Sequence, residues 1–241
     1  MQEHQTDNPN THLFVSDLTI PVTNTWFTPD FWAQHQDEAM PASGRGSVNF
    51  VKTQNGRFVI RQYLRGGLVS KFSHDRFFFM GAKRSRPYRE LALLNYMQDQ
   101  KLPAPIPVAG IYHRQGLSYT ASIMTHLIPN AKELFHFLMP TEFDCREWPK
   151  INWHAIGSTI RRFHDAGIDH VDLNCHNIML DKDNRIWLID FDKCQKRPPN
   201  KHWQRRNLNR LQRSFNKEAL KHSTFQYDEQ DWNTLLEGYN G

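Results

Sequence analysis

The 241-residue sequence is poor in cysteine. Its three thiols are Cys145, Cys175 and Cys194, and no two of them form a C-x-x-C pair. An odd and widely spaced set of cysteines argues against a disulfide framework or a zinc site, and it favours a reducing compartment. Thirteen histidines are present, but no H-E-x-x-H motif occurs, so a metalloprotease is not supported.

Long apolar runs are also missing. No run approaches the ~20 residues of a membrane-spanning helix. The segment from Met1 to Asn10 is polar and lacks an apolar centre, so we expect no signal peptide. These absences predict a cytoplasmic protein, one that can still lie on a membrane surface.

Basic residues exceed acidic ones, 30 against 25, which gives a formal net charge of +5. This charge favours an anionic partner: a nucleotide, an acidic membrane surface, a phosphorylated lipid or a nucleic acid. Because no recognised nucleic-acid-binding motif is present, we do not expect a nucleic acid as the partner.

The most informative stretch runs from His170 to Asp192. Asn177 follows Asp172 by five residues, and Asp190, in an Asp-Phe pair, follows Asn177 by thirteen. This is the H-x-D-L-x-x-x-N and Asp-Phe spacing of protein kinases. Asp172 would accept the proton of an attacking hydroxyl, while Asn177 and Asp190 would hold magnesium against the phosphates of ATP. The alternative is two short strands with acidic loop ends.

The surrounding pattern suits such a site. Residues 178–180 and 186–189 are apolar and flank a segment of turn composition, which predicts a hairpin with a catalytic group at each open end. A long helix from about Ile151 to Ala166 precedes the motif, with a core stripe of Ile156, Ile160 and Phe163. Gly167 is a natural stop for that helix.

A glycine-rich segment upstream contains Gly44 and Gly46, and Asn49 stands where a kinase has its third glycine. Glycines let backbone amides come close to phosphates, so Gly44 and Gly46 are predicted to bind nucleotide. An ordinary hairpin turn would look similar. Two predicted strands follow, 48–52 and 57–63, joined by an Asn-Gly turn.

Arg61 occupies the position at which protein kinases carry a phosphate-binding lysine. Arginine also binds phosphates and remains charged, although its geometry differs from that of lysine. Lys52 is a reserve candidate. Glu90 lies early in a predicted helix from Pro87 to Gln100, where it would pair with the cation of the strand. The alternative for Glu90 is a favourable charge near a helix N-terminus.

Other parts of the chain give weaker signals. Residues 1–12 read as a frayed tail, and Thr28 as the N-cap of a helix beside an aromatic cluster that anchors this segment to the core. The remaining predicted elements are strands at 13–15 and 18–20, a hairpin of 108–113 and 117–124, a hinge at Ile123–Leu127 that meets the adenine, a short helix from an Asn130 cap to Leu138, and a closing helix at 228–239.

An aromatic run at Phe77, Phe78 and Phe79 precedes Met80 in a basic connection that also contains Lys71, Arg76, Lys83 and Arg84. Such a segment could touch a membrane or a lipid acceptor. A buried apolar plug beneath a loop is an equal alternative.

Several features of protein kinases are missing after the motif. Asp192 replaces the glycine of Asp-Phe-Gly, Val171 replaces the arginine before the catalytic Asp, there is no Ala-Pro-Glu motif, and 49 residues remain. These departures argue against control by an activation loop and against a large peptide-binding lobe. A small molecule or a glycolipid is therefore the expected acceptor.

Residues 193–221 are strongly basic, with ten lysines and arginines and one acidic residue, Glu218. The pattern from Trp203 to Lys221 is helical. Leu208, Leu211, Phe215 and Ala219 fall on one side, and Arg206, Arg210, Arg213 and Lys217 on the other. The basic side is placed to receive a phosphorylated or carboxylated acceptor or an anionic membrane; a solvated helix face is the alternative.

Four segments together resemble the 3-deoxy-D-manno-octulosonic acid (Kdo) kinases, a bacterial branch of the lipopolysaccharide kinase group with a protein-kinase-like fold. They are residues 59–68, 86–90, 169–178 and 207–211, and the resemblance extends from about Trp26 to Tyr239. It implies a single α+β domain over 1–241, with a small, mostly β N-lobe (about 13–125) and a short, mostly α C-lobe (about 128–241).

The resemblance further implies ATP and Mg²⁺ as cofactors. The implied reaction phosphorylates the 4-hydroxyl of Kdo on a lipid A precursor, at the cytoplasmic face of the inner membrane, where the enzyme would be peripheral. Alternatives are a heptose kinase of the same pathway, another small-molecule or atypical protein kinase, a non-enzymatic scaffold and a nucleic-acid binder.

Overall fold

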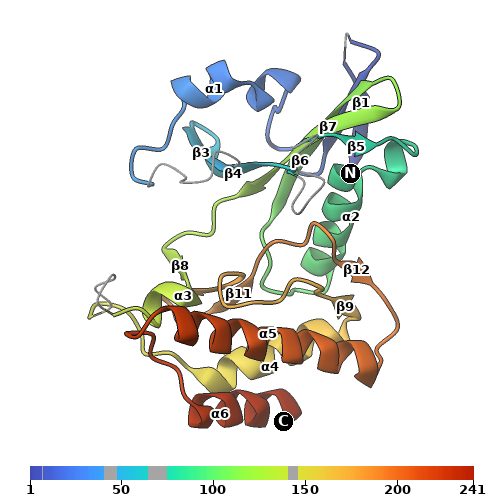
Figure 1. The fold of residues 1–241 in the computed structure, drawn as a ribbon. Coiled ribbons are helices and arrows are strands. Elements are labelled where there is room, and N and C mark those ends of the chain that lie inside the picture. The colour runs from blue at the N-terminus through green and yellow to red at the C-terminus, as the bar shows by residue number, and fades with distance from the viewer. Residues whose placement is uncertain (7, 41–47, 65–74, 141–145) are drawn as a thin grey trace. The chain divides into compact units, whose positions relative to one another are not determined.

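The computed structural model describes residues 1–6, 8–40, 48–64, 75–140 and 146–241. The chain divides into two compact units, Met1–Tyr96 with Pro105–Leu127 and Met97–Ala104 with Ile128–Gly241. Strands dominate the first unit and helices the second (Figure 1). The predicted α+β class is confirmed.

The first unit is built on an antiparallel sheet. Its strand order is β1-β2-β6-β7-β4-β3, and β5 also pairs with β7. The bounds are β1 Gln2–Gln5, β2 Thr11–Val15, β3 Val48–Thr53, β4 Gly56–Gln62, β5 Phe77–Phe78, β6 Pro107–Gln115 and β7 Ser118–His126. Burial alternates along β4, where Phe58 and Ile60 are fully buried, and Val51 on β3 is fully buried as well.

Two predictions near the N-terminus are wrong. The residues expected to fray form β1, which pairs with β2 from Gln2↔Val15 to Gln5↔His12. Residues 18–20, expected to be a strand, form a turn. The carboxylate of Asp17 accepts hydrogen bonds from the backbone N–H and hydroxyl of Thr19, at 3.0 and 2.6 Å, and this local bonding competes with a strand.

The predicted helix cap at Thr28 is confirmed. After the 3₁₀ turn η1 (Asn24–Phe27), the hydroxyl of Thr28 accepts a hydrogen bond from the N–H of Phe31 at 3.4 Å, at the start of α1 (Pro29–Gln34). The neighbouring aromatic residues Trp26, Phe31 and Trp32 pack against the core of the sheet, as expected for an anchor.

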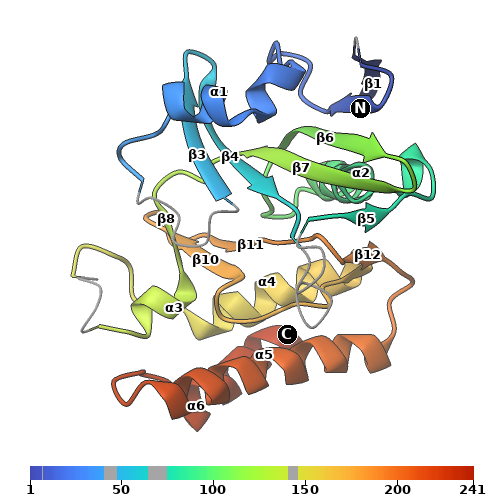
Figure 2. The ribbon, with the colours of Figure 1, turned by 45° about the horizontal axis from the view of Figure 1, so that its top comes forward.

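One face of the sheet is covered by α2 (Arg86–Asp99), which follows the 3₁₀ turn η3 (Ala82–Arg84) (Figure 2). The helix comes close to β6 because Gly110 has no side chain. A Cβ at Gly110 would lie 2.8 Å from Cβ of Pro87 and 3.0 Å from Cδ1 of Leu91. The bounds of α2 confirm the predicted helix from Pro87 to Gln100 to within one residue at each end.

The second unit contains α3 (Leu134–Phe137) and three longer helices, α4 (Trp153–Asp165), α5 (Lys201–Lys221) and α6 (Glu229–Asn240). Helices α4 and α5 run antiparallel. The ring of Trp153, at the start of α4, contacts Phe215 near the end of α5, and His164 near the end of α4 contacts Trp203 near the start of α5. The close crossing of α4 and α6 requires Gly157, because a Cβ there would lie 1.9 Å from the carbonyl oxygen of Leu235. The predicted stripe of Ile156, Ile160 and Phe163 is buried, as expected.

The predicted hairpin is confirmed as β10 (Ile178–Asp181) and β11 (Ile186–Leu188). A third strand, β8 (Ala131–Glu133), pairs with β10, and β9 (Ile168–Asp169) pairs with β12 (Gln195–Lys196). The prediction that Asn130 caps a helix is wrong. Residues 131–133 are extended because β10, which is distant in the sequence, supplies their pairing partner.

The expected hinge at Ile123–Leu127 ends at the boundary between the two units, although most of it is strand. Residues 123–126 belong to β7, which lies between β4 and β6, so its backbone groups bond to strands on both sides. The division between the units follows Leu127. Within the described ranges, Cys175 and Cys194 are buried and form no disulfide, and no helix has the length and hydropathy of a membrane span.

Candidate active site

The predicted ion pair between β4 and α2 is present in the first unit. Nη2 of Arg61 lies 2.6 Å from Oε1 and 2.9 Å from Oε2 of Glu90. The hydroxyl of Tyr63 donates to Oε2 at 2.7 Å. The carboxylate of Glu90 is buried and accepts from both Arg61 and Tyr63. The arrangement fixes the guanidinium, which is itself 24% exposed, at the end of β4.

The other candidates for nucleotide binding in this unit fare differently. Lys52 is exposed on β3 and pairs in register with Arg57, whereas Arg61 pairs with Val48 at the other end of the same ladder. The reserve candidate is therefore four residues from the Glu90 ion pair. Gly44 and Gly46 lie outside the described residues.

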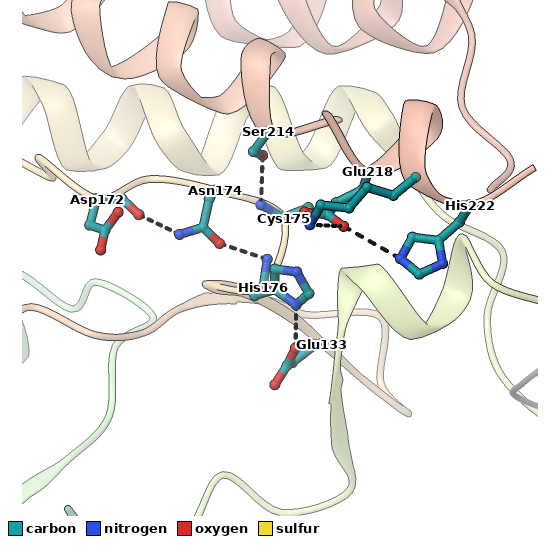
Figure 3. Close-up of polar contacts among 9 residues, drawn as sticks. Glu133, Asp172, Asn174, Cys175, His176, Ser214, Glu218 and His222 are labelled. Atoms are coloured by element: carbon teal, nitrogen blue, oxygen red, sulfur yellow. Dashed lines mark hydrogen bonds and ion pairs between the residues drawn. The ribbon is translucent and has the colours of Figure 1, made fainter. Parts of the chain in front are cut away.

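In the second unit, the residues from His170 to Asn177, hereafter the catalytic loop, are held by their own side chains. The amides of Asn174 and Asn177 both donate to the carbonyl oxygen of Asp172, at 2.8 and 2.9 Å. The N–H of His176 donates to Oδ1 of Asn174 at 2.9 Å (Figure 3). These bonds fix the backbone of Asp172 and leave its carboxylate 41% exposed.

Asp190 is brought to Asn177 by a backbone hydrogen bond. The N–H of Ile189, the residue before Asp190, donates to the carbonyl of Asn177 at 3.0 Å. Asp190 then adopts a left-handed conformation (φ 64°), which is uncommon for a residue other than glycine and is frequent at functional sites. The ring of Phe191 is buried against Phe163 of α4, with centroids 5.9 Å apart, and so secures this turn.

His170 connects the two ends of the site. Its Nε2 bonds to the carbonyl of Ile189 at 2.9 Å, and its ring lies 4.9 Å from that of Phe191. Burial lowers the pKa of His170 below its ordinary value, so the ring is neutral at neutral pH. A neutral and buried ring suits a structural tie better than proton transfer.

The chemistry of Asn177 and Asp190 fits a magnesium ion. The amide nitrogen of Asn177 is used in the bond to Asp172, so its oxygen remains an acceptor. Mg²⁺ is usually bound through one or two side-chain oxygens together with phosphates and water. Asn177 would supply an amide oxygen and Asp190 a carboxylate, from backbone positions that one hydrogen bond joins, and these are ligands of the required kind.

A buried carboxylate anchors the loop from below. Asp169 is fully buried and accepts hydrogen bonds from Arg197, Arg206 and Asn207, each at 2.9 Å. Oδ1 of Asn207 in turn accepts from the N–H of His170 at 3.0 Å. This network joins α5 to the chain immediately before the catalytic loop.

The basic helix α5 contacts the loop at two more points. Nη2 of Arg210 donates to Oδ1 of Asp172, and the N–H of Cys175 donates to the hydroxyl of Ser214 at 3.0 Å. The apolar side predicted for this helix is confirmed by the burial of Leu208, Leu211 and Phe215. Two cations of the predicted basic side, Arg206 and Arg210, bond to Asp169 and Asp172.

A second polar cluster closes the far end of the loop (Figure 3). Nδ1 of His176 lies 3.0 Å from Oε2 of Glu133 on β8. Near it on α5, Glu218 pairs with Lys221 at 2.9 Å and with His222 at 3.6 Å. Burial raises the pKa of Glu218, but the hydrogen bond and charge of Lys221 outweigh burial, and the net effect is a lowered pKa.

Sequence reasoning named Asp172, Asn177 and Asp190, and it placed Arg210 on a basic side that could receive an acceptor, but it assigned no role to Asn174, Asp169 or Asn207. Asn174 had a local signal, because an Asn two residues after Asp172 can bond back to the backbone. Asp169 and its three partners had none. Their contacts span 28 to 38 residues and exist only because α5 packs beside the loop.

These features are those of a kinase. The same fold is found in a solved structure described as WaaP in complex with acyl carrier protein, with a TM-score of 0.56 and 16% identity, covering 95% of this chain and 88% of that one. A model of the lipopolysaccharide kinase (Kdo/WaaP) family matches residues 29–239. The chain belongs to this family, and is thus a phosphotransferase that acts on an alcohol group.

Three relatives are named 3-deoxy-D-manno-octulosonic acid kinase. The one from Vibrio cholerae is 38% identical over 193 residues, 80% of each chain. The one from Haemophilus influenzae (strain 86-028NP) is 36% identical over 248 residues, the full length of both. The one from Xanthomonas axonopodis pv. citri is 42% identical over 191 residues, 78% of this chain and 73% of the other.

Proposed function

We propose that the protein transfers the γ-phosphoryl group of ATP to the 4-hydroxyl of Kdo on a lipid A precursor, in the synthesis of the lipopolysaccharide inner core. One observation carries the proposal. A loop with Asp172, Asn174 and Asn177 held around a single carbonyl occurs in a chain that is 36% identical, end to end, to a protein named Kdo kinase.

In this mechanism Asp172 orients the acceptor hydroxyl and accepts its proton as the phosphoryl group is transferred. The position suits the task because the backbone is fixed while the carboxylate stays accessible. Asn177 and Asp190 would hold Mg²⁺, which neutralises charge on the phosphates when it is bound. The reaction needs no further covalent chemistry from the protein.

Arg61 is assigned to the phosphates of ATP, with Glu90 and Tyr63 fixing its side chain. Gly44 and Gly46 are assigned to the same phosphates through their backbone amides. We infer that residues 1–241 form one kinase-like domain, with an N-lobe of about 13–125 and a C-lobe of about 128–241.

A lipid-linked acceptor implies work at the cytoplasmic face of the inner membrane, as a peripheral protein. Exposed apolar groups support this location: Phe78 is 62% exposed and Met80 is 61% exposed. Within this run Phe77 is buried, as the apolar-plug alternative expects, whereas Phe78 is exposed and is available to a membrane. Exposed Lys83 and Arg84 follow in sequence and would attract anionic lipid.

The decisive experiment follows label from γ-labelled ATP, with magnesium, to a Kdo-bearing lipid A precursor. Label on the sugar acid that disappears in Asp172→Ala would support enzyme class, acceptor and base together. Label on a heptosylated core, or on a soluble acceptor, would keep the kinase and reject Kdo. Binding of ATP without transfer to any acceptor would point to a scaffold.

A further inference from the structure

Helix α5 lies alongside the catalytic loop and contacts it at regular intervals. Asn207 bonds to His170, Arg210 to Asp172 and Ser214 to Cys175. Residues three or four apart share one face of a helix, so these contacts come from a single face of α5. The contacts of Asn207, one turn before Arg210, and of Ser214, one turn after it, therefore hold Arg210 opposite Asp172.

The ion pair of Arg210 with Asp172 differs from its neighbour at Asp169. Asp169 is 0% exposed and accepts from three donors. Arg210 is 47% exposed and Asp172 is 41% exposed. A pair this accessible to water contributes little to stability, so the fold does not depend on it. Both side chains remain open to a ligand.

The place of Arg210 restricts which part of an acceptor can reach it. A hydroxyl that gives its proton to Asp172 must come within about 3 Å of the carboxylate. An acidic group on the side of the acceptor that faces α5 can then reach the guanidinium, whose fork of N–H donors matches a carboxylate. In a sugar acid, the carboxylate belongs to the same sugar as the reacting hydroxyl.

We propose that Arg210 is an acceptor-binding residue that takes the carboxylate of the sugar acid and, in doing so, releases Asp172 for the reacting hydroxyl. This inference rests on the proposed Kdo kinase function and adds the group by which the acceptor is recognised. It makes the enzyme selective for an acidic sugar, because a neutral sugar leaves Arg210 paired with Asp172.

The test combines a variant of the protein with a variant of the acceptor. Transfer is measured for the natural enzyme and for Arg210→Gln, with a Kdo-bearing lipid A precursor and with the same lipid after reduction of its carboxylate to an alcohol. Either change alone is expected to lower kcat/KM for the acceptor by about 10- to 100-fold. The two together should cost little more than one, because they remove the same interaction.

Arg205→Gln is the matched control. It removes the same charge from an exposed position of α5 that has no bond to the loop among the described residues, and transfer should be unchanged. Arg210→Lys should fall between Arg210→Gln and the natural enzyme, since an ammonium lacks the fork. The KM for ATP and the thermal midpoint should stay as in the natural enzyme in all three variants.

Losses that multiply in the combined experiment would overturn the proposal, as would full transfer by Arg210→Gln. A loss that follows removal of the lipid phosphates, and not of the carboxylate, would also overturn it. Unfolding of both Arg210 variants would do the same, because it would make the pair structural. Failure of the natural enzyme to phosphorylate either lipid is a separate result and would reject the proposed function itself.

Discussion

The guanidinium of Arg61 is held by the carboxylate of Glu90, with Nη2 2.6 Å from Oε1 and 2.9 Å from Oε2. The proposed function gives this arginine the task that a lysine has in protein kinases. Tyr63, the residue directly after β4, donates to the same carboxylate and helps to hold it in place. The ion pair restrains the long side chain of Arg61 and so holds a permanent positive charge in one place.

Replacing Arg61 by alanine should weaken nucleotide binding. A charge-assisted contact to a phosphate is lost, and an increase of about 10- to 100-fold in the KM for ATP is expected. Arg89→Ala, at an exposed position on α2, is the control. Titration of both variants with ATP would measure the effect. Equal affinities would show that another cation binds the phosphates.

Asp172→Ala should remove most of the turnover. A positioned base contributes typically ~10²–10⁴ in rate, so kcat should fall by about that factor while ATP affinity is retained. Asp183→Ala removes an exposed carboxylate from the β10–β11 turn and should leave turnover unchanged. If Asp172→Ala also lost ATP binding with an intact fold, Asp172 would have a different role.

The sequence predicts the elements that local spacing determines. The loop and the hairpin between Asp172 and Asp190 were predicted correctly, because two apolar runs on either side of a short turn can pair with each other only as a hairpin. The pairing of Arg61 with Glu90 was also predicted, since a known fold places a strand cation beside that helix. Contacts between distant segments, such as Arg210 with Asp172, had no signal in either segment alone.

Errors arose where long-range pairing overrode local preference. Residues 2–5 are polar and carry no strand pattern, yet the backbone of β2 pairs with them. Residues 131–133 look like the start of a helix and are extended by β10. In both cases the deciding hydrogen bonds come from a partner strand, which a single segment cannot reveal.

Asp169→Ala should destabilise the protein. The change removes the acceptor for Arg197, Arg206 and Asn207, and Asn207 is itself buried. Because the two arginines are about half exposed and can be hydrated again, a loss of about 2–3 kcal/mol in the free energy of unfolding is expected. Urea titration would measure it. Asp165→Ala, which breaks an exposed pair with Arg161, should cost less than about 1 kcal/mol.

The stability of the second unit should fall in mild acid. Burial lowers the pKa of His164 to about 4, from an ordinary value of 6.5. As the pH is lowered, the unfolded chain takes up a proton at this histidine near pH 6.5, whereas the folded chain does so only near pH 4. The free energy of unfolding therefore has its full value above pH 6.5 and decreases as the pH drops from 6.5 to 4. The shift corresponds to about 3 kcal/mol.

His164→Gln tests this pH dependence. The variant should lose less stability than the natural protein when urea midpoints are compared at pH 7 and pH 5. His202→Gln removes an exposed histidine from α5 and should retain the full loss. Equal losses in all three proteins would show that other groups cause the acid sensitivity.

Membrane binding should depend on the exposed face of β5. Phe77 and Phe79 turn toward the sheet, where Phe79 lies 5.5 Å from the ring of Tyr112, whereas Phe78 and Met80 point away from it. Phe78→Glu with Met80→Glu removes apolar contact and adds charge that anionic lipid repels, so binding to vesicles should drop sharply. Co-sedimentation with vesicles of anionic and of neutral lipid would measure this.

The same substitutions should leave transfer to a detergent-solubilised acceptor intact, because no residue of the proposed chemistry is altered. Unchanged vesicle binding would move the membrane contact to another surface, with the basic side of α5 as the next to be tested.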